Sequence, residues 1–437
     1  MKSYRLCDLS EQRIADLCQR NPGSDPSLMR TCQDIFQRVE SQGDEAIREY
    51  THRFDGVDIS QFRVSAQEFS VATAKLPVRS RKALEHAARN IRKFHAAQQV
   101  DEKPVQVESG VCCWRESRAI DSVGLYIPGG NAILPSTVLM LGIPAQLAGC
   151  RRVALCVPPR QDCSVAAEVL VAARIAGIEE IFKIGGAQAI AALAIGTETV
   201  AGVDKILGPG NRWVQAAKLL ATLRGVAIDM VAGPTEVLVV ADDSAPSEWV
   251  ACDLVSQAEH GVDSRAILVT TSDRLLEQVA RRVWQLIEDL PLRDLAEQSL
   301  KESFSLLADS LDGALAFANQ YAPEHLILQV KKPEQWTDRV RHAGSVFLGP
   351  WSPEVAGDYA SGTNHTLPTS GLAKAYSGVS VDSFVKRITF QEITPQGLQG
   401  LAPTLEALAE MEGLEGHRRA VQIRRDSQLQ RPTAKGS

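Results

Sequence analysis

The feature that most constrains the fold is an alternation of short apolar runs with segments of helical periodicity between residues 123 and 290. Short apolar runs that stop at turn residues are typical of buried strands, and the segments between them are typical of amphipathic helices. Strands are expected at residues 123–127, 152–157, 181–184, 205–207, 237–241 and 266–270. Helices are expected at residues 138–143 (capped by Ser136), 165–176, 187–195, 214–223, 248–260 and 275–290. This order predicts an α/β protein with parallel sheets.

Glycine turns follow three of these strands, at residues 128–130, 185–186 and 208–210. In a parallel sheet, ligands bind at the carboxyl ends of the strands, where such turns lie. The dinucleotide fingerprint Gly-x-Gly-x-x-Gly is absent, because the turn at 208–210 lacks the third glycine and is followed by Trp213. The turns permit a phosphate to approach the backbone, and tight turns without a ligand remain the alternative.

Length and composition exclude several classes of protein. A chain of 437 residues can form two or three domains, and a net charge of −6 argues against a nucleic-acid binder. The stretch from Ser122 to Cys150 has no charged residue, but its prolines and glycines indicate a buried strand, loop and helix rather than a membrane span. The first residues show no apolar signal core, and nine scattered cysteines form no disulfide framework. We therefore expect a cytoplasmic protein without a membrane or nucleic-acid partner.

The ends of the chain differ from this central alternation. Residues 1–22 read as a polar arm or small helix, and the rest of the first hundred residues reads as mainly helical. Residues 105–116 have a strand-like pattern, and later strands are expected at 326–329 and 345–348. From about Phe384 the pattern is mainly helical, notably at residues 401–410 and 414–425, and the polar tail 426–437 is expected to be disordered.

A candidate metal site lies at the end of the helix expected at 248–260. Gly261 is expected just past that end, and Gln257 and His260 are three residues apart, so both side chains share one face. A neutral imidazole beside an oxygen donor can begin a zinc site. Glu259 is a rival ligand, and by chemistry alone the carboxylate is preferred. A structural histidine at a helix end is the alternative interpretation.

Three further segments carry histidines beside acids. Glu324 and His325 follow Pro323 at an expected corner between a loop and a strand, where they could act as general base and second proton acceptor. A surface pair is the alternative there. Asp358 could supply an oxygen ligand and His365 a hydrogen bond, unless residues 356–365 form an ordinary solvated loop.

Near the C-terminus, Glu412, Glu415 and His417 taken alone read as a helix-surface charge cluster. However, four of the eight histidines fall in these four segments. That clustering is the best local indication of one shared site.

Seven motifs, in order along the chain, together resemble the histidinol dehydrogenase family. They are residues 124–130, 185–189, 208–211, 232–236, 256–261, 323–325 and 357–365. The match covers nearly the whole chain and includes Glu412 and His417. The resemblance implies a zinc- and NAD-dependent enzyme that ends histidine biosynthesis. It would oxidise L-histidinol to L-histidine through histidinaldehyde, in two hydride transfers to two NAD.

The resemblance also implies a role for each matching residue. One Zn²⁺ per subunit would be held by Gln257, His260, Asp358 and His417, which replaces the preference for Glu259. Glu324 and His325 stand at the proton-acceptor positions. The positions that contact NAD are Tyr126, Gln188 and Asn211. The positions that contact substrate are Thr235, Gln257, His260, His325, Asp358, His365, Glu412 and His417. Position 235 is often serine in the family, and threonine keeps the hydroxyl.

The family fold implies two related, incomplete Rossmann-like domains with small, mainly helical terminal segments. An arm is expected at 1–22, and a zinc-binding and catalytic α/β domain at 23–122 with 240–380. The NAD-contacting domain is expected at 123–239, and a C-terminal helical segment at 381–437. The family forms an intertwined homodimer, so each site would take Glu412 and His417 from the other chain.

Two other functions are alternatives to this one. A paralogous zinc and NAD dehydrogenase could act on another polar diol or amino alcohol, but it should lack the residues that read the imidazole and amine. The presence of His365, Glu412 and His417 disfavours it. A catalytically inactive binding protein on the same fold is disfavoured by the intact Glu324–His325 pair and metal set.

Overall fold

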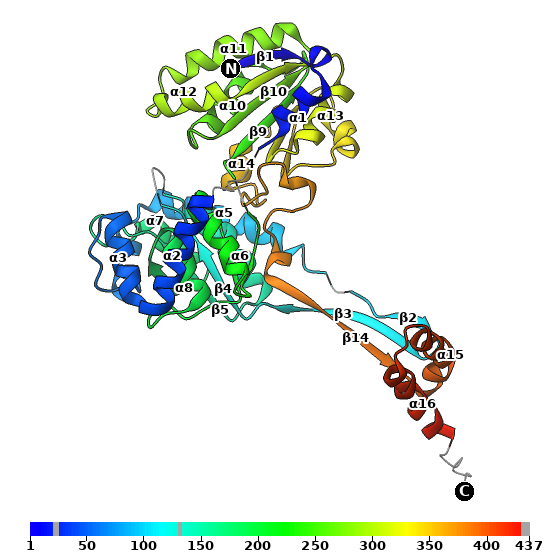
Figure 1. Cartoon of the computed structure of the whole chain (residues 1–437). Helices are drawn as coiled ribbons and strands as arrows, with labels where there is room; N and C mark the ends of the chain where they lie inside the picture. The colour runs from blue at the N-terminus through cyan, green and yellow to red at the C-terminus, as the bar shows by residue number, and fades with distance from the viewer. Residues whose placement is uncertain (21–25, 101, 130–132, 232, 430–437) are drawn as a thin grey trace. The chain divides into compact units, whose positions relative to one another are not determined.

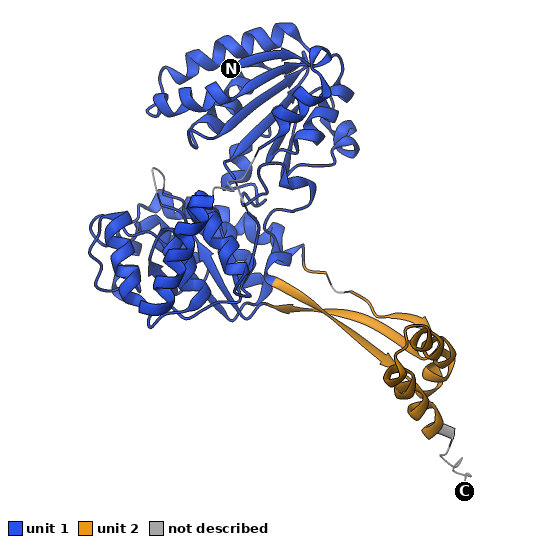
Figure 2. Ribbon diagram, viewed as in Figure 1, with its two compact units in different colours: residues 1–98, 120–384 blue, residues 99–119, 385–437 orange. Residues whose placement is uncertain are grey.

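The computed structural model describes residues 1–20, 26–100, 102–129, 133–231 and 233–429. Gly130 and Ala232, which belong to two of the motifs, and the tail 430–437 lie outside the described residues. The chain divides into two compact units (Figure 2). The first unit comprises Met1–Gln98 and Ile120–Phe384, and the second comprises Gln99–Ala119 and Val385–Ser437. The candidates up to His365 therefore belong to the first unit, and Glu412 and His417 belong to the second.

The first unit contains a six-stranded parallel sheet that carries the catalytic candidates (Figure 1). Its strands, in spatial order, are β1 (Lys2–Arg5), β11 (Phe304–Leu307), β10 (Arg265–Thr270), β9 (Glu236–Ala241), β12 (His325–Gln329) and β13 (Ser345–Leu348). Both faces are covered by helices, namely α10 (Ser247–Ala258), α11 (Asp273–Ile287) and α12 (Arg293–Glu302) on one face and α1 (Glu11–Cys18) and α13 (Leu311–Tyr321) on the other. The expected polar arm thus supplies an edge strand and a helix of this sheet.

Alternating side chains of β9 explain why this sheet is buried on both faces. Val237 and Val239 belong to the buried cluster under α10 and α11, whereas Leu238 and Val240 belong to the cluster under α13. Successive residues of a strand point to opposite faces, so an unbroken apolar run serves both layers.

A second parallel sheet in the same unit carries the glycine turns. Its strands, in spatial order, are β6 (Glu180–Lys183), β5 (Arg152–Val157), β4 (Ser122–Tyr126), β7 (Lys205–Leu207) and β8 (Ala227–Ile228). One face is covered by α2 (Pro26–Gln42), α3 (Asp44–Asp55), α8 (Gly186–Ile195) and α9 (Arg212–Thr222). The other face is covered by α4 (Ala66–Lys75), α5 (Val78–Ala96), α6 (Pro135–Ala148) and α7 (Ala167–Ile175). Two parallel sheets confirm the expected α/β class.

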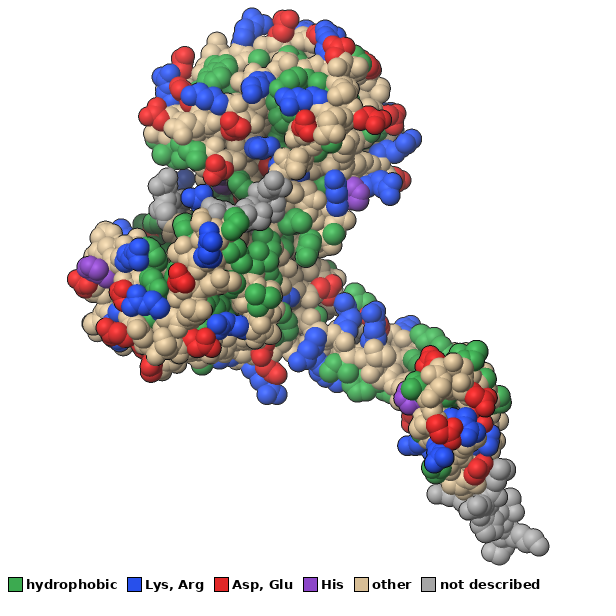
Figure 3. Space-filling model, in the orientation of Figure 1, with side chains coloured by type: hydrophobic (Ala, Val, Ile, Leu, Met, Phe, Trp, Pro, Cys, Tyr) green, Lys and Arg blue, Asp and Glu red, His purple; other side chains and the backbone are tan. Residues whose placement is uncertain are grey.

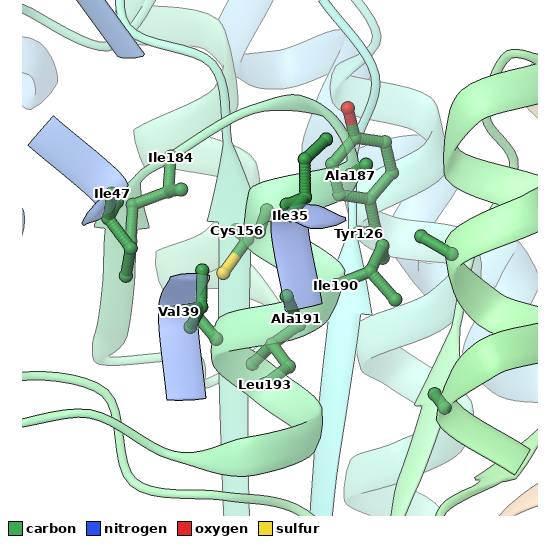
Figure 4. Close-up of a cluster of buried hydrophobic side chains, with 14 of the residues drawn as sticks. Ile35, Val39, Ile47, Tyr126, Cys156, Ile184, Ala187, Ile190, Ala191 and Leu193 are labelled. Atoms are coloured by element: carbon green, nitrogen blue, oxygen red, sulfur yellow. The ribbon is translucent and has the colours of Figure 1, made fainter. Parts of the chain in front are cut away.

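The helices of the first hundred residues pack on this second sheet. Ile35 and Val39 of α2 lie beside Ile190 and Leu193 of α8, next to Cys156 of β5 (Figure 4). The sequence interpretation instead grouped residues 23–122 with 240–380. Apolar periodicity marks the buried face of a helix, but it does not specify which sheet that face will cover. The structure therefore assigns α2–α5 to the sheet with the glycine turns.

The second unit combines a long antiparallel sheet with two helices. The sheet has the order β14 (Val385–Ile393), β3 (Val111–Ala119) and β2 (Val105–Glu108), and the helices are α15 (Pro395–Met411) and α16 (Glu415–Leu429). The expectation of mainly helical structure after Phe384 missed β14, whose side chains are mostly exposed and lack a clear apolar alternation. Because α16 continues to Leu429, the first residues of the expected tail are helical.

The remaining elements are short. They are α14 (Glu354–Tyr359) and the 3₁₀ helices η1 (Leu6–Asp8), η2 (Pro333–Arg339), η3 (Leu372–Lys374) and η4 (Val381–Phe384). Within the described part of the chain, no helix is both long and apolar enough to cross a membrane.

Candidate active site

The catalytic candidates lie at the amino ends of two neighbouring strands of the six-stranded sheet, β9 and β12. Thr235 directly precedes β9, Glu324 directly precedes β12, and His325 is the first residue of β12. Because β9 and β12 are parallel neighbours with His325 opposite Val237, these side chains lie at one edge of the sheet. The glycine turns, in contrast, follow the carboxyl ends of the strands of the other sheet, as expected.

Glu324 is buried and accepts two hydrogen bonds at the same oxygen. The Thr235 hydroxyl donates to Oε2 over 2.5 Å, and the backbone N–H of Glu236 donates to Oε2 over 3.0 Å. Burial raises the pKa of Glu324 well above its usual range, and the two donors act in the opposite direction. Burial thus favours the protonated carboxyl, while the Thr235 hydroxyl and the Glu236 N–H favour the carboxylate.

His325 is buried, and its two ring nitrogens have different surroundings. Nδ1 lies 3.3 Å from the backbone oxygen of Glu236, whereas Nε2 has no hydrogen-bond partner among the described residues. The carbonyl can only accept, so Nδ1 carries the proton and Nε2 keeps its lone pair. Burial lowers the pKa of His325 to about 4, which keeps the ring neutral at physiological pH, while Asp358 opposes the shift. This tautomer suits a general base that acts through Nε2.

Gln257 is held so that its amide oxygen stays available. Its Nε2 donates to the Thr235 hydroxyl over 3.1 Å, and its buried Oε1 has no partner in the described ranges. Gln257 lies near the end of α10, which stops at Ala258 with Glu259 as its C-cap. His260 follows the helix, and Gly261 does not adopt the left-handed conformation of a glycine C-cap. Gly261 thus lies past the end of the helix, as expected, but it is not the residue that caps it.

Three side chains bring potential metal ligands together. The ligand atoms of His260, Glu354 and Asp358 all lie within 4.8 Å of one another. His260 is exposed, whereas Glu354 and Asp358 are buried. The rival ligand Glu259 does not belong to this group.

Glu354 is the residue of this group that the sequence interpretation missed. Its carboxylate is 1% exposed, neither oxygen has a hydrogen-bond partner within the described part of the chain, and Oε1 lies 3.6 Å from Nδ1 of His325. Burial, followed by the Asp358 charge, raises the pKa of Glu354 well above its usual range. Residues 354–359 form helix α14, so positions 354 and 358 share one helix face. The spacing of four from Asp358 was the available signal, but no helix was expected at these residues.

His365 forms hydrogen bonds with two helices of the first unit, α6 and α14. Its Nε2 lies 3.0 Å from the hydroxyl of Thr137 on α6, and its Nδ1 lies 2.9 Å from the backbone oxygen of Asp358. His365, Thr235 and Glu324 line a small cavity of about 100 Å³ together with Gly208 and Gly210 of a glycine turn. The catalytic candidates and that turn therefore border the same space.

A larger cavity of about 1250 Å³ lies at the carboxyl ends of β4, β5, β6 and β7, and Tyr126, Gln188 and Asn211 all line it. The Tyr126 hydroxyl accepts a hydrogen bond from Gly186 N over 3.0 Å, which fixes the ring on the turn that begins α8. Gln188 is fully buried, and both atoms of its amide lack partners among the residues described. Asn211 caps α9 by accepting from Trp213 N and Val214 N. Two helix N-termini and one side-chain amide without a described partner in the same cavity suit a phosphate-bearing ligand.

The backbone at position 208 requires glycine. Its φ is +130°, and a Cβ atom there would lie 2.2 Å from the backbone oxygen of Tyr126. Two hydrogen bonds with buried side chains also fix the backbone of this turn. Gly208 N donates to Asp229 over 2.8 Å, and the buried Lys218 side chain donates to Gly208 O over 2.9 Å. Lys218 and Asp229 form a buried ion pair. Only glycine fits this backbone.

Comparison with known proteins identifies the family. The family model described as histidinol dehydrogenase matches residues 18–425. The chain belongs to the histidinol dehydrogenase family, a family of oxidoreductases.

Individual histidinol dehydrogenases agree with this assignment over most of their length. The chain is 51% identical to histidinol dehydrogenase of Bacteroides fragilis, over 91% of this chain and 93% of that protein. It is 48% identical to the chloroplastic histidinol dehydrogenase of Arabidopsis thaliana, over 97% of this chain and 91% of that protein. The crystal structure of histidinol dehydrogenase from Elizabethkingia anophelis superposes with a TM-score of 0.95 at 47% identity, covering 98% of this chain and 99% of that one.

Two residues that the resemblance to histidinol dehydrogenases predicts for the site belong to the second unit. Glu412 is the C-cap of α15 and His417 lies in the first turn of α16, and both are exposed. Glu415 of the same cluster pairs instead with Arg418 and Arg419 on the helix surface. The contact of His417 with zinc, and of Glu412 and His417 with substrate, stays a prediction.

Proposed function

We propose that the chain oxidises L-histidinol to L-histidine in two steps, with histidinaldehyde between them and NAD⁺ as the hydride acceptor in each. One observation carries this proposal beyond family membership. The Thr235 hydroxyl donates to Glu324 and accepts from Gln257, so one hydroxyl links a predicted proton acceptor to a predicted metal ligand. Such a link is expected where proton transfer occurs beside a bound metal.

The residues present fit a zinc ion. Gln257 offers a buried amide oxygen without a partner among the described residues, and His260 and Asp358 offer a nitrogen and an oxygen close together. Nitrogen and oxygen donors of this kind are ordinary zinc ligands. We propose that Gln257, His260 and Asp358 hold one Zn²⁺ per subunit, together with His417. When bound, the ion supplies a Lewis-acidic centre for the nitrogen atoms of the substrate.

In the first step, His325 acts as the base. Its Nε2 accepts the proton of the substrate hydroxyl while the adjacent carbon loses a hydride. The Nδ1 proton remains directed at the backbone oxygen of Glu236, which fixes the orientation of the ring. This step removes two electrons and two hydrogens and leaves an aldehyde.

In the second step, Glu324 acts as the base. Its carboxylate takes one proton from the water as the water adds to the aldehyde, so that the adduct is the anion of the hydrate. Loss of a hydride from this anion to the second NAD⁺ leaves the carboxylic acid, which releases its remaining proton to solvent to give the carboxylate. Thr235 and the backbone of Glu236 donate to the Glu324 carboxylate and stabilise its ionised form against burial. The role of Thr235 is thus to lower the pKa of Glu324 and so favour the carboxylate that acts as base.

We further propose that NAD⁺ binds in the cavity lined by Tyr126, Gln188 and Asn211. The N-termini of α8 and α9 and the unpaired amide of Gln188 support this assignment. The small cavity that joins the turn at Gly208 to Thr235 and Glu324 supports a path from the dinucleotide to the substrate.

The second unit supports a dimer in which sites are shared. Helices α15 and α16, beside Glu412 and His417 in the sequence, carry exposed apolar side chains: Leu408 is 48% exposed, Met411 75% and Ile423 68%. Figure 3 shows hydrophobic side chains on the surface of this unit. Contiguous exposed apolar surface marks protein interfaces. We propose that a second copy of the chain covers them and that each site takes Glu412 and His417 from its partner.

Mixing two inactive variants tests this sharing. His325→Asn disables the site built on its own chain, and His417→Ala disables the site built on the other chain. If sites are shared, the mixed dimer has one intact site, and co-expression restores about a quarter of wild-type activity because random pairing makes half of the dimers mixed. If each site is built from one chain, mixing restores nothing.

The activity itself is tested by NADH formation with L-histidinol, with a simple diol and an amino alcohol as controls. Preference for L-histidinol supports the proposal, and faster turnover of a control would favour the paralogous dehydrogenase. We also propose that the enzyme works in the cytoplasm, which is supported by nine cysteines that are all free thiols.

A further inference from the structure

The large cavity contains an acid to which the proposed chemistry gives no role. Asp55 is the last residue of α3 and lines the cavity. Its Oδ2 is buried and has no hydrogen-bond partner within the described ranges. A buried carboxylate oxygen without a donor is unfavourable unless a ligand supplies one.

The position of Asp55 matches a place where dinucleotide-binding domains keep an acid. The sheet has the order β6-β5-β4-β7, so β5 stands where the second strand stands in a Rossmann half. In that fold, an acid near the end of the second strand binds the 2′-hydroxyl of the adenosine ribose. Here β5 ends at Val157, and the residues that follow it in the cavity lining are Pro158, Pro159, Arg160 and Gln161. None of these four is acidic.

Asp55 is held against this same loop by its backbone. The side chain of Gln161 donates to the backbone oxygen of Asp55 over 3.0 Å. Gly56 ends α3 in the left-handed conformation, with φ +69°, and its N–H bonds the backbone oxygen of His52. Although Asp55 belongs to α3, it thus places a carboxylate beside the loop that follows β5.

The surroundings favour hydroxyl groups as its ligand. Burial raises the pKa of Asp55 to about 6, so the group is an acceptor-only carboxylate at neutral pH. The neighbouring hydroxyls of a ribose can donate two hydrogen bonds to one carboxylate, whereas a 2′-phosphate would bring a second negative charge. Arg53 and Arg160 are exposed at the same cavity and are available to a phosphate if Asp55 is neutralised.

We propose that Asp55 determines the dinucleotide specificity: its carboxylate binds the ribose hydroxyls of the adenosine half of NAD and rejects a 2′-phosphorylated dinucleotide. This role of Asp55 rests on the proposed use of NAD and assigns the residue that distinguishes NAD from its 2′-phosphorylated form. Asp34 lines the same cavity but is exposed, so it is the matched control for a change of charge.

The test measures binding rather than turnover. Dissociation constants of NADH and NADPH are measured by calorimetry for the wild type, Asp55→Asn, Asp55→Ser and Asp34→Asn. We expect the wild type to prefer NADH and both Asp55 variants to lose about 10- to 100-fold of that preference, the contribution of a hydrogen bond to a charged group. Asp34→Asn should change the ratio by less than about 3-fold, as expected for a screened surface charge.

The possible failures are distinguishable. A wild type that binds NADH and NADPH equally, or Asp55 variants that keep the wild-type ratio, would overturn the role of Asp55. A wild type that binds neither dinucleotide would instead overturn the proposed use of NAD. Two variants are used so that a folding defect in one does not decide the outcome.

Discussion

Replacing Thr235 with valine tests whether the Thr235 hydroxyl links the proton acceptor Glu324 to the proposed metal ligand Gln257. Valine keeps the shape of threonine but cannot donate to Glu324 Oε2, which lies 2.5 Å away, or accept from Gln257 Nε2, which lies 3.1 Å away. Glu324 retains the donor Glu236 N at 3.0 Å, whereas the Nε2 atom of Gln257 loses its partner. We therefore expect the free energy of unfolding to fall by about 1–3 kcal/mol, the cost of an unpaired polar group.

The substitution should affect both the metal site and the proton acceptor Glu324. Metal affinity should fall by about 10- to 100-fold, the usual effect of removing a group that orients a metal ligand. Burial already raises the pKa of Glu324, and losing a donor to its carboxylate should raise it further. The acid limb of the pH profile for histidinaldehyde oxidation should therefore move to higher pH, because Glu324 must be ionised to act as base.

The matched control is Thr235→Ser, which keeps the hydroxyl and should keep both the metal affinity and the pH profile. Metal affinity is measured by competition with a chelator, and kcat/KM is measured against pH with excess metal. If Thr235→Val keeps the wild-type metal affinity and acid limb, the hydroxyl does not connect the two groups, and the proposed function loses its supporting observation.

The other predictions concern the individual roles. One divalent ion should bind per chain and a chelator should abolish turnover, because Gln257, His260 and Asp358 offer a compatible ligand set; metal analysis that finds no stoichiometric ion in active protein would contradict this. His325→Asn should leave metal and NAD binding nearly intact but slow oxidation by roughly 10²–10⁴-fold, and an unchanged rate at neutral pH would remove His325 from the role of base. With a pKa lowered to about 4, wild-type His325 is neutral above that pH, so its protonation should reduce the rate only in more acidic solution. Glu324→Gln should slow the oxidation of supplied histidinaldehyde much more than the oxidation of histidinol, and equal losses in single-turnover measurements would mean that Glu324 serves position or electrostatics.

Local patterns in the sequence determined most of the elements of the two parallel sheets. The strands expected at 152–157 and 205–207 coincide with β5 and β7, and the strand expected at 237–241 lies within β9. Short apolar runs and glycine turns specify such elements because strand and helix periodicities are properties of neighbouring residues. Likewise, the order of motifs was sufficient to identify the histidinol dehydrogenase family.

Only the tertiary structure decided which elements meet. The sequence marks α2 and α3 as helices, but their packing on the sheet that contains β5 depends on contacts between residues far apart in the chain. The same holds for β1, whose pairing with β11 joins Tyr4 to Leu306. The local sequence of a helix or strand does not specify which of two parallel sheets it will pack on or pair with.

The site shows the same division. Resemblance between motifs named Glu324, His325, Gln257 and Asp358, but not Glu354, which becomes notable only because folding buries it beside His325 and Asp358. An acid in a sequence has no environment, and burial and neighbouring charges that exist only in the folded chain change its pKa. The sequence therefore determined which groups could carry the chemistry, and the tertiary structure decided which of them are buried together, because that depends on long-range packing.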